Sequence, residues 1–98
     1  MKRFALNRLA ERDLDELKKY LAVAAGSEIT RRVMQDLRDA FAFLGKEPQA
    51  GHSREDLTER AIRSWPVYSY LVVYDPATNP VQILRLLDGR RNVEDILN

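Results

Sequence analysis

The sequence predicts an α+β domain in which a small antiparallel sheet carries an N-terminal helical hairpin. Two apolar stripes at helical spacing follow one another in the first half of the chain. Three runs rich in β-branched and aromatic residues follow in the second half, separated by turn residues. Because 98 residues suffice for one core, we expect residues 1–98 to form a single domain. The expected order is strand, helix, helix, strand, strand, strand and a short last helix.

The first two elements are a short strand and a helix. Phe4 and Leu6 stand two residues apart, which indicates a strand over residues 2–7. Residues 11–25 predict a helix, because leucines recur on one face and charged side chains on the other. Gly26 is expected to end this helix, since glycine is the usual residue just past a helix C-terminus.

A second, longer helix follows directly. Ser27 is expected to cap its start, and Gly45 with Pro48 to end it. About two residues join the helices, so they must lie antiparallel, and their apolar stripes must face a third layer, the sheet. The stripe of the second helix holds Ile29, Val33, Leu37, Ala40, Phe41 and Leu44.

The second half of the chain predicts strands. Residues 49–59 are polar and without periodicity, which is typical of a surface loop. The predicted strands cover residues 61–65, 68–74 and 81–87. Pro66 is expected to close the first of them, and Asn92 to cap the short last helix. The long helical excursion before these strands permits a crossover connection to the first strand.

Composition excludes several classes of function. The chain has no cysteine, so it has no disulfide, thiolate metal site or cysteine nucleophile, and its single histidine, His52, excludes a multi-histidine metal site. We therefore expect no metal and no cofactor. A net charge of +1 does not favour direct nucleic-acid binding. No apolar run approaches the roughly 20 residues of a membrane helix and no signal peptide is visible, so we expect a cytoplasmic protein without membrane contact.

Three tyrosines gather on the strongest predicted strand. Tyr68, Tyr70 and Tyr74 share one face of it. If exposed, this face would stack bases or anchor a peptide. If packed on the helices, the tyrosines would direct their hydroxyls to the rim of the core. Alternation does not choose between these interpretations, because the opposite face is apolar as well.

Arginines gather towards the C-terminus. Arg85 stands inside an apolar strand, where a charge needs a partner. A cationic patch of Arg63, Arg85, Arg90 and Arg91 would hold an acidic peptide or phosphate groups. The alternative is that Arg85 pairs with an internal acid such as Asp88 or Asp95, while the other arginines are solvated.

The remaining conspicuous residues favour binding over catalysis. A general base needs a partner and an orienting group, and neither is signalled near His52, so we expect a solvated surface histidine. Trp65 before Pro66 indicates an interior anchor, with an interface hot spot as the alternative. The sequence contains no nucleophile elbow, glycine-rich phosphate loop or metal-ligand set.

The order of several segments resembles the ParE-type toxins of the ParE/RelE superfamily. The similar segments are residues 10–17, 62–67, 69–74 and 81–91, and they include Ile83-Leu84-Arg85 before a Gly89-Arg90-Arg91 turn. The resemblance implies a RelE/ParE-like fold and the role of toxin in a type II toxin–antitoxin system. It also implies a ParD-like antitoxin that wraps an acidic, amphipathic segment over the toxin in a hetero-oligomer. ParE-type members poison DNA gyrase, whereas RelE-type members cut messenger RNA on the ribosome.

The residues favour gyrase as the target. RNA-cutting relatives commonly supply a tyrosine or histidine near the C-terminus together with basic residues. Here nothing after Tyr74 is tyrosine or histidine, and Lys46 is the last lysine. We therefore expect a gyrase inhibitor that acts by protein–protein contact without chemistry of its own. A RelE-type endoribonuclease is the alternative, and an inactive toxin-derived binding domain is the second. The chain departs from the family pattern at Asp88, where many relatives carry histidine.

The resemblance and the patterns together give candidate site residues. The target-binding candidates are Arg63, Arg85, Arg90, Arg91, Ile96 and Leu97. The antitoxin is expected to contact the exposed side of the hairpin and the uncovered face of the sheet, by docking a helix in a groove and pairing its carboxylates with arginine. The candidates for this contact are Leu14, Leu17, Ile29, Val33, Phe41, Tyr68, Tyr70, Tyr74 and Arg85. Periodicity does not separate core positions from groove positions among them.

Overall fold

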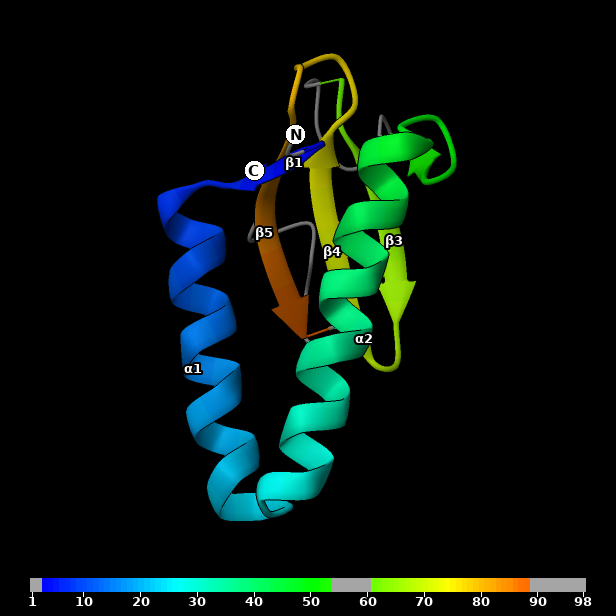
Figure 1. The fold of residues 1–98 in the computed structure, drawn as a ribbon. Coiled ribbons are helices and arrows are strands. Elements are labelled where there is room, and N and C mark those ends of the chain that lie inside the picture. The colour runs from blue at the N-terminus through cyan, green and yellow to red at the C-terminus, as the bar shows by residue number, and fades with distance from the viewer. Residues whose placement is uncertain (1–2, 54–60, 89–98) are drawn as a thin grey trace.

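In the residues that this computed structural model describes, 3–53 and 61–88, two helices lie on a five-stranded sheet (Figure 1). This confirms the predicted α+β fold with an N-terminal helical hairpin. The elements are β1 Phe4–Leu6, α1 Arg8–Ala24, α2 Ser27–Lys46, β2 His52–Ser53, β3 Arg63–Val67, β4 Tyr70–Asp75 and β5 Val81–Asp88. No helix in the described part of the chain is long and apolar enough to span a membrane.

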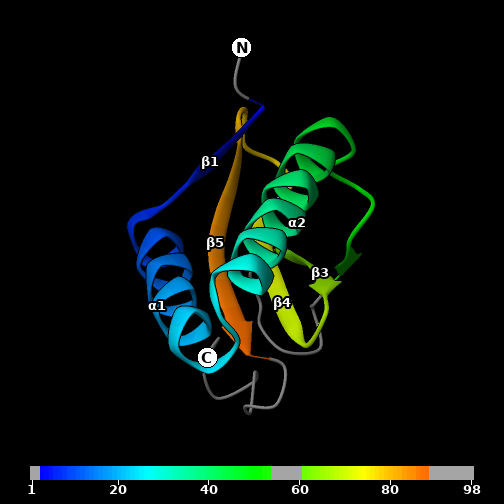
Figure 2. The same ribbon diagram turned by 60° about the horizontal axis from the view of Figure 1, so that its bottom comes forward.

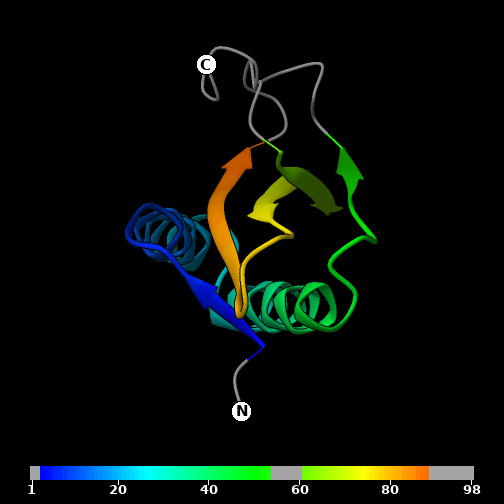
Figure 3. The ribbon, with the colours of Figure 1, turned by 90° about the horizontal axis from the view of Figure 1, so that it is seen from above.

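The sheet is mixed, in the order β1-β5-β4-β3-β2. β1 runs parallel to β5 and pairs Phe4 with Val81 and Leu6 with Ile83, while the other strand pairs are antiparallel. The predicted crossover is confirmed: the chain leaves β1, forms both helices and returns to the sheet (Figure 3). The small sheet expected to be antiparallel is therefore mixed, because the helical excursion after β1 is long enough to let this strand lie parallel to β5.

Both helices cover one face of the sheet, α1 alongside β5 and α2 across β4 (Figure 2). The apolar stripes of the two helices meet the sheet there. The core between the layers includes Leu21, Leu37, Phe41, Leu44, Val72, Tyr74, Ile83 and Leu86. A smaller cluster packs separately and consists of Val73 on β4, Leu87 on β5 and Ile62 just before β3. The joined ends of the helices extend past the end of the sheet (Figure 1).

Local capping chemistry moves two predicted helix starts. The side chain of Asn7 accepts a hydrogen bond of 2.9 Å from the Ala10 backbone nitrogen, so α1 begins at Arg8, earlier than predicted. The prediction of Ser27 as N-cap of α2 is wrong. Gly26 occupies that position at φ 89, in a region of backbone space that glycine adopts without a Cβ clash, and Ser27 is the first helical residue.

Three strand predictions also need correction. Pro66 lies inside β3 rather than closing it. At this position β3 has only β4 as a neighbour among the described strands, so the N–H that proline lacks is not needed for pairing with a second strand. Tyr68 is not on a strand but opens the two-residue turn between β3 and β4, at φ 55. β2 forms inside the predicted loop, because His52 pairs with Ser64. The short helix predicted after Asn92 lies outside the described residues.

Candidate interaction site

Arg85 on β5 is held by Asp13 on α1. The guanidinium donates through Nε to Oδ2 of Asp13 at 2.7 Å and through Nη2 to Oδ1 at 3.1 Å. The same carboxylate accepts the backbone N–H of Leu86 at 3.0 Å. Such a two-pronged arginine–carboxylate pair fixes both side chains in one geometry.

The strand geometry explains why Arg85 meets a helix. β1 pairs with β5 only as far as Ile83, so no described strand covers the same side of β5 beyond that residue. A bulge in the β4–β5 ladder sets Arg85 opposite Val73 and Ile83 opposite Tyr74. Bulges redirect side chains at strand edges. The α1 carboxylate thus takes the place that a neighbouring strand would occupy.

The expected alternative for Arg85, pairing with an internal acid, is confirmed. The acid is Asp13, 72 residues away, which was not among the examples expected, and one of those, Asp95, lies outside the described residues. The hydrogen bond that the guanidinium donates to the Asp13 carboxylate raises the pKa of Arg85 above its ordinary value. Sequence reasoning missed Asp13, although a signal existed: Asp13 interrupts the buried face of α1 between Ala10 and Leu17, as Arg85 interrupts β5.

A cavity of about 400 Å³ opens beside this pair, between α1 and the ends of β4 and β5. Three candidates for antitoxin contact, Leu17, Tyr70 and Arg85, meet in its wall. Glu16 and Asp88 also line it, together with the exposed ring of Tyr20. Because Arg85 is paired with Asp13, its positive charge is already compensated within the wall.

Two antitoxin candidates are core residues. Phe41 is buried against the ring of Phe4, with centroids 5.6 Å apart. Tyr74 is buried, and its hydroxyl donates to the Pro48 carbonyl at 2.7 Å and accepts from the Gly51 N–H at 2.8 Å. For Tyr74 the packed interpretation therefore holds, and neither side chain offers a surface to a partner.

The other apolar candidates lie at different depths. Leu14 and Val33 are half-buried and pack against the core. Ile29 is exposed near the start of α2. Tyr68 is 62% exposed in its turn, and its hydroxyl donates to the Asp36 carboxylate on α2. That hydrogen bond raises the pKa of Tyr68 and ties the β3–β4 turn to the helix.

The described arginines do not form the predicted cationic patch. Arg63 on β3 donates from Nη1 to the Gly51 carbonyl at 2.7 Å, and β4 lies between it and Arg85. Each arginine is thus engaged by a different partner. The other members, Arg90 and Arg91, and the target-binding candidates Ile96 and Leu97 lie outside the described residues.

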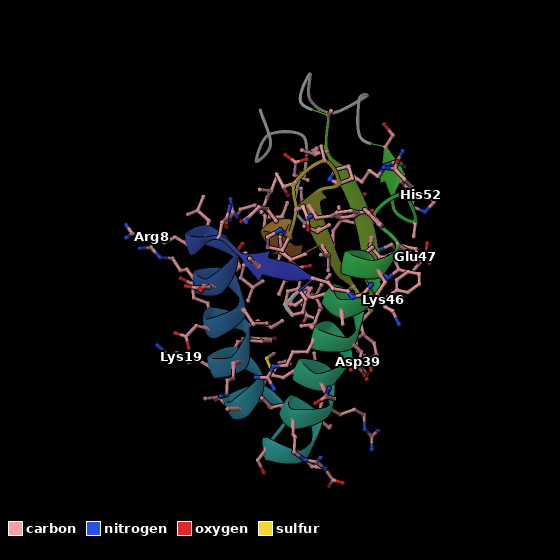
Figure 4. All side chains as sticks on the ribbon, turned by 45° about the horizontal axis from the view of Figure 1, so that its top comes forward. Arg8, Lys19, Asp39, Lys46, Glu47 and His52 are labelled. Carbon is pink, nitrogen blue, oxygen red and sulfur yellow. The ribbon has the colours of Figure 1, made fainter. Side chains whose placement is uncertain are left out.

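The remaining conspicuous residues have ordinary surroundings. His52 lies exposed on β2 (Figure 4) and makes no side-chain hydrogen bond or ion pair with a described residue. Trp65 is half-buried and packs its ring on Phe43 of α2, with centroids 5.3 Å apart, which is the expected anchor role. Among the described residues, no three His, Asp or Glu side chains form a group that could hold a metal ion.

Comparison with known proteins gives the family. Residues 4–93 match the model of the ParE toxin of the type II toxin–antitoxin system parDE. The chain is 30% identical over 81 residues to Toxin ParE3 of Caulobacter vibrioides, covering 83% of this chain and 80% of that protein. It shares its fold with a solved structure described as the chromosomal ParDE TA system from P. aeruginosa, with a TM-score of 0.71 and 22% identity over 87% of this chain and 92% of the other. The chain therefore belongs to the ParE toxin family of type II toxin–antitoxin systems.

Proposed function

We propose that this chain is the toxin of a toxin–antitoxin pair, that it inhibits DNA gyrase in the cytoplasm by protein–protein contact, and that a ParD-like antitoxin neutralises it. The observation that carries the proposal is the family match over residues 4–93, which spans nearly all of the chain. A toxin relative matched over 80% of its own length supports the same assignment.

The hydrogen-bond partners of the described titratable side chains favour inhibition by contact over RNA cleavage. Cleavage of RNA without a metal needs a base and an acid placed on either side of one phosphate. Tyr74 is buried with its hydroxyl engaged twice, and the hydroxyl of Tyr68 is engaged by Asp36. His52 has no acid or base among its described hydrogen-bond partners.

We assign contact with an apolar part of the antitoxin to the cavity between α1 and β5, because the arginine of this cavity is already paired with Asp13. Its wall combines half-buried Leu17 and Tyr70 with exposed Tyr20, and aromatic side chains of this kind are frequent interface anchors. We assign target contact to the same end of β5, where Arg85 is fixed by Asp13. A toxin that offers one end to both partners would be silenced by simple competition.

The test is a supercoiling assay with purified gyrase. We expect the chain to block supercoiling and to accumulate cleaved DNA held by gyrase, and we expect added antitoxin to restore supercoiling. Asp15→Ala, a change at an exposed helix position, should behave like the unaltered chain. Intact supercoiling together with loss of messages in a translating extract would instead establish the ribonuclease. No effect in either assay would establish an inactive binding domain.

A further inference from the structure

We draw no further inference here: the strongest candidate, the aromatic surface patch of Phe43, Trp65 and Tyr68 where α2 lies beside β3 and the β3–β4 turn, is partly exposed, but nothing in the described part of the structure shows what covers it.

Discussion

At the scale of single residues, Asp13 connects α1 to β5 through three hydrogen bonds to its carboxylate. Its carboxylate holds Arg85 and the Leu86 N–H together. Asp13→Ala would leave both donors without this acceptor, and we expect the free energy of unfolding to fall by about 2–3 kcal/mol. Asp15→Ala removes only an exposed pair with Lys19 and should cost less than about 0.5 kcal/mol. Urea unfolding of both variants measures the difference, and equal losses would contradict the assigned role of Asp13.

Ser64 presents the opposite case. Its hydroxyl is buried on β3 and has no hydrogen-bond partner among the described residues. A buried polar group without a partner lowers stability, so removing it should not harm the fold. We expect Ser64→Ala to leave the free energy of unfolding unchanged or to raise it by up to about 1 kcal/mol. A loss of more than about 1 kcal/mol in a thermal or urea unfolding curve would show that the hydroxyl has a stabilising contact.

The burial of Tyr74 predicts that the stability of the fold decreases at alkaline pH. Burial raises the pKa of its phenol above the ordinary value near 10. The folded state therefore retains the proton more strongly than the unfolded state. The contribution of the protonated Tyr74 to stability is complete below about pH 10 and is lost as the pH rises through the pKa of the folded form.

We expect the free energy of unfolding to fall as the pH rises above about 10, and to fall less in Tyr74→Phe. That variant starts lower because it leaves the Gly51 N–H and the Pro48 carbonyl without the hydroxyl that they bond in the unaltered chain. Tyr20→Phe alters an exposed ring and should follow the unaltered chain. Parallel curves for all three proteins would remove Tyr74 as the cause. The measurement is chemical unfolding at each pH.

At the scale of elements, the approach of the α2–β2 connection to the sheet depends on Gly51. A Cβ at that position would lie 2.7 Å from a ring carbon of Tyr74 and 2.8 Å from the Ser64 carbonyl oxygen. Gly51→Ala must therefore push β2 away from β3, and we expect it to cost about 2 kcal/mol or more. Gly26→Ala meets no atom within 4 Å and bears only the strain of a positive φ, about 1 kcal/mol. Comparing the unfolding midpoints of the two variants tests this order.

The elements also show how far sequence reasoning reaches. The stripes of α1 and α2 predict both helices, because apolar residues rarely recur every 3.6 positions over so long a segment by chance. Two-residue β2 has no period to detect, and Tyr68 has high strand propensity but occupies a turn. For the site, the charge of Arg85 inside β5 shows that a partner is required. It does not show which one, because Asp13 comes close only after the crossover has formed.

At the scale of the whole molecule, stability is distributed unevenly. β4 and β5 pair along six residue positions and hold buried Val72, Val73 and Ile83. The joined ends of the helices extend past the sheet and expose Val23 and Ile29. We expect amide hydrogen exchange to be slowest in β4 and β5 and at least about tenfold faster over residues 20–30. Uniform exchange rates would mean that the hairpin and sheet open as one unit.

The place of β5 in the sheet has a consequence for the timing of toxicity. This strand is the last described element to be translated, yet it lies between β1, the first, and β4. Until Val81–Asp88 leaves the ribosomal tunnel, β1 has no neighbour and the helices lack Ile83 and Leu86 to cover. A chain that ends before β5 cannot complete this sheet, so under the proposed function we expect toxic activity to begin only after β5 has been translated, which gives antitoxin already present nearly the whole period of translation to act.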